Sequence, residues 1–234
     1  MRKIFKAFSL VEMILTLGIL SIVFLLTTRT LTTLIQVSTV TKYKTATRTE
    51  ADFIVELVDR FLSNSKIDDM YIFDTRTCRS YDPTNGLGTT LTNAELQECY
   101  LESLDLGVIG SEIHVRLSGY DQMTCIGFFR TDPSDQSSNG YILKKTVEFG
   151  DTNEHYECFD GSVFNETTYP VMVLNSKDIT VKDFLVSYAQ SESSNNIFYV
   201  DLEMEPLYWA PGMDNIEKAV LRQSIVTTQG LTWY

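Results

Sequence analysis

One apolar stretch near the N-terminus decides how this chain folds: Phe8–Thr28, with the sequence FSLVEMILTLGILSIVFLLTT. Its 21 residues include a single charged side chain, Glu12. The segment before it, MRKIFKA, carries three positive charges and no negative ones. A run of this length can cross the hydrocarbon core of a bilayer as a helix, and basic flanks stay on the cytoplasmic side. The sequence therefore predicts one membrane-spanning helix, with the rest of the chain outside.

Three interpretations of this stretch are open on the residues alone. The first interpretation is a cleaved signal peptide, but the stretch is long for one, and no small-x-small cleavage site follows it. The second interpretation is a plain signal anchor. Such an anchor should not contain Glu12, since a carboxylate in a spanning helix costs on the order of 1–3 kcal/mol. The third interpretation gives Glu12 a function. If the chain is cut between Ala7 and Phe8, Glu12 becomes the fifth residue, where the helix dipole and an α-amino group of its own or a neighbouring chain favour a negative charge.

The segment Lys6-Ala7-Phe8-Ser9-Leu10-Val11-Glu12-Met13 resembles the class III signal of type IV pilins and pseudopilins. That family has a short basic leader, a small residue before the cut, Phe after it, Glu as the fifth mature residue, and an apolar helix. Ala7 stands where the family usually has glycine. The resemblance implies cleavage at Ala7–Phe8 by a membrane prepilin peptidase, N-methylation of Phe8, and a role for Glu12 in setting subunit register.

The helix is expected to continue well beyond the membrane. The first proline is Pro83, so the strongest helix breaker is absent from the first 82 residues. From 51 to 62 the sequence is amphipathic, with Phe53, Leu57 and Phe61 four residues apart and Ile54, Val58 and Leu62 beside them on one broad apolar face. The sequence predicts a helix from Phe8 to about Leu62, with residues 8–28 in the membrane and 29–65 as its amphipathic half. Gly18, Ser21 and ten threonines between 27 and 49 leave open whether the helix is continuous or locally unwound.

From residue 66 to the C-terminus the pattern changes to short apolar or alternating runs separated by turn residues. A short helix is expected at Glu95–Ser103. Hairpins are expected where 125–130 leads to 141–145 and where 181–189 leads to 197–205. A long helix followed by an antiparallel sheet predicts the α+β class, with residues 66–234 as an extracytoplasmic head. The predicted strands are Met70–Asp74, Glu112–Ser118, Met123–Arg130, Tyr141–Phe149, His155–Phe159, Val171–Leu174, Val181–Ala189, Ile197–Glu205 and Ala219–Thr227.

The order of motifs in the head resembles the larger minor pilins and pseudopilins of the PilW/GspJ class. The residues that carry this resemblance are GYILKK at 140–145, DITVKDFLVSY at 178–188, FYVDLEM at 198–204 and LRQSIVT at 221–227. It implies the pilin fold, in which the N-terminal helix packs on the sheet. It also implies a structural subunit whose partners are other pilin or pseudopilin subunits, the prepilin peptidase and methyltransferase, and the inner-membrane assembly platform.

Charge divides the chain at the end of the predicted helix. Residues 1–65 carry 8 basic and 5 acidic side chains, whereas residues 66–234 carry 11 basic and 26 acidic ones, a net charge of −15. An acidic head without clustered Lys and Arg disfavours charge-based binding to nucleic acid. We expect a precursor with its N-terminus in the cytoplasm and its head outside, and a mature form in a pilus or pseudopilus.

Four cysteines, Cys78, Cys99, Cys125 and Cys158, allow three disulfide connectivities in an exported domain. We predict Cys78–Cys99 and Cys125–Cys158, with free buried thiols as the alternative. No C-x-x-C spacing is present, which disfavours a metal or redox centre.

We expect no enzyme, cofactor or metal. The two histidines are His114, in an alternating strand where packing is the expected role, and His155 in a turn. No phosphate-binding glycine loop is present. A calcium site would have to use scattered acidic residues with no loop motif: Asp132, Asp135, Asp151, Glu154 and Asp160. The functional expectation is a filament subunit of pilus, secretion or competence type. The alternatives are the major pilin of the same filament and a signal-anchored extracellular binding domain that never polymerises.

Overall fold

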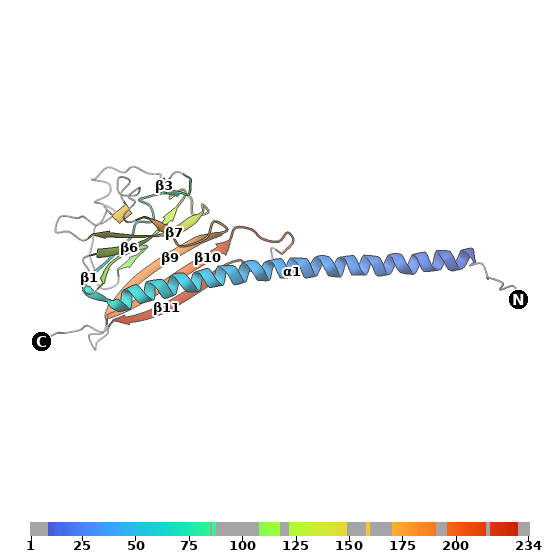
Figure 1. The fold of residues 1–234 in the computed structure, drawn as a ribbon, viewed down its shortest axis with the longest axis horizontal. Coiled ribbons are helices and arrows are strands. Elements are labelled where there is room, and N and C mark those ends of the chain that lie inside the picture. The colour runs from blue at the N-terminus through green and yellow to red at the C-terminus, as the bar shows by residue number, and fades with distance from the viewer. Residues whose placement is uncertain are drawn as a thin grey trace.

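The computed structural model describes residues 9–84, 86–87, 108–117, 122–148, 158–159, 170–190, 196–213 and 216–228. These residues form one long helix and a β-rich head, so the α+β class is confirmed (Figure 1). The predicted helix at Glu95–Ser103 lies outside the described residues. The elements are α1 (Leu10–Asn64), β1 (Ser65–Phe73), β2 (Tyr81–Asp82), β3 (Gly86–Leu87), β4 (Ile109–Gly110), β5 (Glu112–Leu117), β6 (Gln122–Arg130), β7 (Gly140–Glu148), β8 (Met172–Val173), β9 (Ile179–Gln190), β10 (Asn196–Pro206) and β11 (Val220–Thr228).

Helix α1 is continuous through Gly18, Ser21 and the threonine-rich segment. Its 55 residues give a length of about 80 Å at 1.5 Å per residue. It ends two residues beyond the predicted Leu62. Ser65 takes an extended conformation there, and its N–H and hydroxyl donate to the carbonyls of Leu62 and Phe61. These bonds satisfy two of the carbonyls that every helix end leaves without a partner.

The two halves of α1 differ in burial. Residues 9–35 are all exposed, and the first buried side chain is Val40. Beyond it, the buried positions recur at helical spacing and form one stripe that packs on the head. The predicted apolar face was wrong in one respect: Phe53 is 53% exposed. Ile54, Val58 and Leu62 are buried as predicted, and the stripe is centred on Ile54 and Val58. The small residue Ala51 beside them lets the helix approach the sheets closely.

The head contains two larger antiparallel sheets and a β2–β3 ribbon. The first sheet has the order β1-β5-β6-β7-β8, and the second has the order β11-β10-β9-β4. Both predicted hairpins are confirmed, since β6 pairs with β7 and β9 pairs with β10 in antiparallel register. Consecutive strands joined by short connections pair most readily because their loop-closure cost is small.

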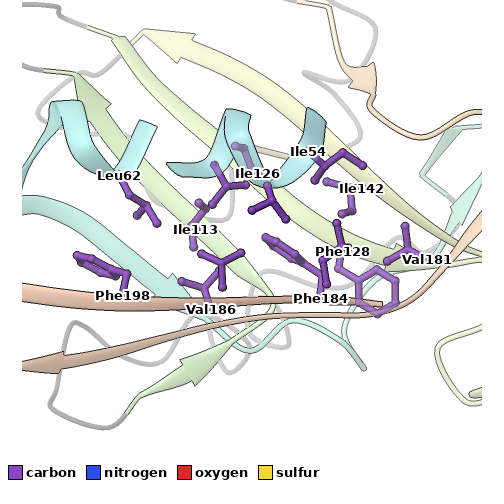
Figure 2. Close-up of a cluster of buried hydrophobic side chains, with 14 of the residues drawn as sticks. Ile54, Leu62, Ile113, Ile126, Phe128, Ile142, Val181, Phe184, Val186 and Phe198 are labelled. Atoms are coloured by element: carbon purple, nitrogen blue, oxygen red, sulfur yellow. The ribbon is translucent and has the colours of Figure 1, made fainter. Parts of the chain in front are cut away.

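The inner faces of both sheets and the second half of α1 share one core. Figure 2 shows Ile54 and Leu62 of α1 pointing into a cluster with Ile126 of β6, Phe184 of β9 and Phe198 of β10. All five side chains are at most 1% exposed. Burying each contributes roughly 1.5–3 kcal/mol, so the second half of α1 is an integral part of the core of the head.

The β1–β8 sheet is buried on its outer face as well. In β6, every residue from Met123 to Phe129 is buried, which a strand with one solvated face would not show. A second cluster, which includes Phe129, Tyr141 and Phe159, covers this face. Cys158 and Phe159 form a 3₁₀ turn, so the strand predicted to reach Phe159 is wrong at these two residues. Its first part, 155–157, lies outside the described residues.

Polar contacts join the two sheets where β7 begins. The N–H of Gly140 donates to Thr180 Oγ1 at 2.8 Å. Asn175 accepts from the N–H of Ile142 at 2.9 Å and donates to the carbonyl of Ile179 at 2.8 Å. Asn175 and Thr180 are at most 5% exposed. These bonds satisfy backbone groups that would otherwise be buried without partners.

Candidate functional site

The exposed half of α1 begins with a capped first turn that contains the predicted register residue. Ser9 is the N-cap, and its hydroxyl accepts from the N–H of Val11 at 3.3 Å. Glu12 lies in this first turn, so its carboxylate is at the positive end of the helix dipole. The predicted cleavage and methylation positions, Ala7 and Phe8, lie outside the described residues. The structure thus places a carboxylate at the start of an unburied apolar helix.

Hydroxyl groups in both halves of α1 are satisfied inside the helix. Ser21 Oγ donates to the carbonyl of Leu17 at 2.8 Å. Nine threonines donate in the same way to the carbonyl four residues earlier: Thr27, Thr28, Thr30, Thr32, Thr33, Thr39, Thr41, Thr47 and Thr49. A polar group that finds its partner within the helix costs less in an apolar environment. Those that lie among the exposed residues 9–35 are therefore compatible both with lipid and with a packed helix bundle.

Within the part of the chain that the structure describes, α1 is long and apolar enough to cross a membrane. Its most apolar 18-residue window has a mean hydropathy of 2.4, and none of it is buried. No protein family model, curated protein or solved structure matches this chain. A single apolar helix next to the N-terminus is consistent with a single-pass membrane anchor.

Carboxylates on the second half of α1 attach it to the head. Asp59 Oδ2 accepts from the hydroxyl of Ser224 in β11 at 2.7 Å. Asp52 forms an ion pair with Arg222 of the same strand. Glu50 accepts from the N–H of Ser176 at 2.9 Å. These contacts fix the axial position of the helix on the head, because each helix position meets one strand or loop position.

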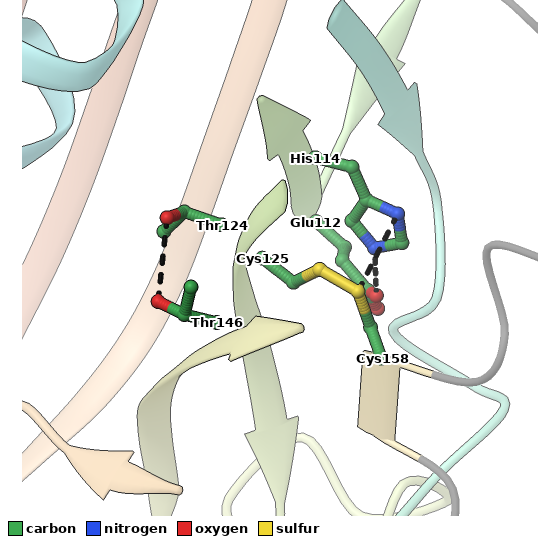
Figure 3. Close-up of a disulfide and its surroundings, with 6 residues drawn as sticks. All are labelled: Glu112, His114, Thr124, Cys125, Thr146 and Cys158. Carbon is green, nitrogen blue, oxygen red and sulfur yellow. Dashed lines mark hydrogen bonds and ion pairs between the residues drawn. A yellow bond between two sulfur atoms is a disulfide. The ribbon is translucent and has the colours of Figure 1, made fainter. Parts of the chain in front are cut away.

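The outer face of the β1–β8 sheet contains a buried polar cluster beside a disulfide (Figure 3). His114 Nε2 lies 2.6 Å from Glu112 Oε1, and neither side chain is exposed. Glu112 Oε2 accepts from the hydroxyl of Thr75 at 2.8 Å. Burial raises the pKa of Glu112, but His114, Arg79 and Thr75 together reverse this and hold that pKa below its ordinary value. Glu112 is therefore a buried carboxylate whose ionised form is stabilised by its partners.

Cys125 and Cys158 form the predicted disulfide, with their Cα atoms 6.3 Å apart. Cys158 Sγ lies 4.0 Å from His114 Nδ1, so three residues with metal-ligand atoms meet here. Both sulfur atoms belong to the disulfide, and the imidazole is paired with Glu112, so these three residues do not form a metal centre in this state. Cys78 is also disulfide-bonded, and its predicted partner Cys99 lies outside the described residues.

The acidic residues considered for calcium make local turns where the structure describes them. Asp132 Oδ1 accepts from the N–H and hydroxyl of Ser134 at 2.9 and 2.7 Å. Asp135 makes the same pair of bonds with Ser137. The Ser134 and Ser137 bonds lower the pKa of Asp132 and Asp135, respectively. The other candidates, along with His155, lie outside the described residues: Asp151, Glu154 and Asp160.

Sequence reasoning missed the pairing of Glu112 with His114. The signal was present, since residues two apart in a strand point to the same face. Glu112 and His114 have this spacing in β5. What the sequence did not show is that this face is covered by Cys158, Phe159 and Thr75, so that both polar side chains are buried.

Proposed function

We propose that this protein is a non-enzymatic filament subunit, a minor pilin or pseudopilin of a type IV pilus or of a related secretion or competence filament. The observation that carries the proposal is the burial pattern of α1. One half of a single continuous helix is packed into the head, whereas residues 9–35 protrude with all their apolar side chains exposed. Such a surface needs lipid before assembly and like helices after it.

The apolar side chains of the protruding half occupy every side of the helix. Leu10 is 76% exposed and Phe24 is 74% exposed, and the large apolar side chains between them are 54–72% exposed. A helix that is apolar all round is suited to complete burial in a bundle or membrane rather than to packing on one surface. This supports a helical filament core made from many copies, in which each protruding half is surrounded by others.

Glu12 is the residue for which a simple anchor offers no reason. In the proposed filament, a prepilin peptidase removes residues 1–7, Phe8 is methylated, and the assembly platform inserts the helix into the growing core. Glu12 then pairs with the Phe8 amine of a neighbouring subunit and sets the axial register. Its position in the first turn of α1, at the positive end of the helix dipole, supports this role. The acidic head is carried on the outside.

Mass spectrometry of the mature N-terminus tests the processing step. The proposal expects a chain that begins with N-methylated Phe8. An intact Met1 would contradict it and favour the anchored binding domain. A cut beyond Thr28 would contradict both, because it removes the membrane-spanning segment. Deletion of the gene separates minor from major subunits, because a priming subunit is needed for filaments but contributes little of their mass.

Glu12→Ala tests the register role in a strain that carries only this allele. We expect filament assembly to be lost while the precursor still reaches the membrane, because the apolar span is unchanged. Glu56→Ala is the matched control, since Glu56 is an exposed carboxylate on the second half of the same helix. Normal assembly by Glu12→Ala would defeat the register role, and assembly lost in both variants would indicate general damage to α1.

A further inference from the structure

We propose that the first part of the β10–β11 connection, Leu207–Met213, rests on the outer leaflet of the bilayer that α1 spans. We call the segment Leu207–Met213 the base loop. The inference rests on the proposed membrane-anchored state of the subunit, and it adds a second lipid contact made by the head. The partner is the headgroup layer of a phospholipid bilayer.

The base loop lies where the head meets the protruding helix. Gln36 Nε2 donates to the carbonyl of Pro211 at 3.0 Å, immediately after the exposed residues 9–35. Figure 1 shows the connection between β10 and β11 as the part of the described head that reaches furthest along α1 toward the N-terminus. Any bilayer that surrounds the protruding half therefore meets this loop before it meets another described part of the head.

The length of the helix places the loop at the headgroups. A hydrocarbon core about 30 Å thick that begins at Leu10 ends near residue 30 at 1.5 Å per residue. Each headgroup layer adds about 5–8 Å, or three to five residues of helix. Gln36 and the bonded Pro211 follow directly. Between Glu12 and Lys42 the helix carries one charge, Arg29, so no row of charges holds the loop away from the lipid.

The composition of the base loop suits that depth. Leu207–Met213 reads LYWAPGM and contains no charged residue, in a head whose residues 66–234 have a net charge of −15. Leu207 is 39% exposed and Tyr208 is 60% exposed. Trp209 is one of two tryptophans in the chain. Tryptophan and tyrosine are the residues enriched at membrane–water interfaces, because their rings are apolar and their tips are polar.

The base loop is also held in a defined shape. The indole of Trp209 donates to the carbonyl of Met213 at 3.0 Å. The N–H of Leu207 donates to the carbonyl of Asp178 at 2.8 Å. Gly212 has φ +80°, a conformation that glycine adopts without strain. A loop ordered in this way presents Leu207 and Tyr208 without a further ordering cost on contact with lipid.

The test uses the full chain in phosphatidylcholine vesicles that carry a spin label either on the headgroup or deep in the acyl chain. In the Trp233→Phe background, Trp209 is the sole fluorophore of its kind. We expect the headgroup label to quench it more strongly than the deep label. The matched control is Tyr199→Trp in a chain with Trp209→Phe and Trp233→Phe. Tyr199 is an exposed aromatic of β10, roughly 23 Å before Pro206 at 3.3 Å per residue, and we expect neither label to quench this tryptophan.

A second reporter separates this inference from the anchor itself. Ile19→Trp, with the two native tryptophans replaced by Phe, lies near the middle of the span and should be quenched by the deep label. If this reporter is quenched and Trp209 is not, the base loop contact is overturned and the anchor stands. If neither the Ile19→Trp reporter nor Trp209 is quenched, both the base loop contact and the membrane anchor are overturned. Trp209 quenching that changes with the protein-to-lipid ratio would place a second copy of the chain on the loop and would also overturn the lipid contact.

Replacing the exposed side chains completes the test. Leu207→Glu with Tyr208→Glu should abolish the quenching of Trp209 by the headgroup label, because two carboxylates disfavour the interface. Tyr199→Glu should leave that quenching unchanged. Circular dichroism and the melting temperature of each variant verify the fold. Quenching that survives the double substitution in a folded chain would contradict the proposal.

Discussion

The imidazole of His114 and the carboxylate of Glu112 are 2.6 Å apart, Nε2 to Oε1, and both are completely buried. Removing one member of such a pair leaves a buried polar group without its partner. We expect Glu112→Gln to lower the free energy of unfolding by about 3–5 kcal/mol at neutral pH. Urea unfolding of the full chain in detergent measures this loss. A loss below that of Asp201→Asn, a carboxylate change on β10, would contradict it.

The same pair predicts how stability depends on acid. The pKa of Glu112 is lowered in the folded chain, so its ionised form stabilises the native state above the unfolded pKa of about 4.3. That contribution is lost as the pH falls below about 4 and through the folded pKa. The unfolding midpoint of the native chain should therefore fall over this range, and that of Glu112→Gln should fall less. If the unfolding midpoints of the two chains fall in parallel with pH, Glu112 does not contribute to the acid dependence of stability.

The hydrogen bond between Asp59 and Ser224 should hold α1 on β11 more strongly than the nearby ion pair does. It is partly buried, with 2.7 Å between Oδ2 and Oγ, and a hydrogen bond to a charged group is worth about 1.5 kcal/mol or more. A double-mutant cycle with Asp59→Asn and Ser224→Ala should give a coupling near this value. The Asp52–Arg222 pair is largely exposed, so its cycle should give less than about 1 kcal/mol. A larger coupling energy for Asp52–Arg222 than for Asp59–Ser224 would contradict this prediction.

Isoleucines on the two halves of α1 offer a matched test of the division of the helix. Ile54 is 0% exposed in the core, and Ile22 is 63% exposed. Ile54→Ala should lower the free energy of unfolding of the head by about 2–5 kcal/mol. Ile22→Ala should leave it unchanged and weaken only membrane insertion or filament assembly. An equal loss of head stability in both variants would show that the protruding half packs on the head.

Gly140 allows β7 to pass close to β9. A Cβ at this position would overlap the carbonyl oxygen of Val181 and the ring of Phe128. Gly140→Ala should therefore lower the free energy of unfolding by about 1–3 kcal/mol. Gly18→Ala is the control, since a Cβ there meets nothing within 4 Å. Calorimetry of both variants distinguishes the close approach from a general effect of replacing glycine.

Local patterns predicted much of the fold. The β6–β7 and β9–β10 hairpins could be predicted from the sequence, because alternating runs on either side of a polar turn pair with each other. The division of the head into two sheets could not be predicted in this way, because it depends on contacts between segments distant in the chain. The face of α1 was misjudged at Phe53 for a similar reason. Amphipathic spacing defines a stripe only approximately, and the packing of Ala51 and Ile54 on the sheets decides its centre.

The sequence by itself determined the long apolar helix, the place of Glu12 in its first turn, and the acidic character of the head. These features follow from composition and spacing along a continuous segment, without reference to any distant residue. Only the tertiary structure decided that Glu112 and His114 are buried together beside Cys158, and that Pro211 meets Gln36 at the foot of the head. Burial and proximity are properties of the packed chain, because each depends on which distant segment covers a given face.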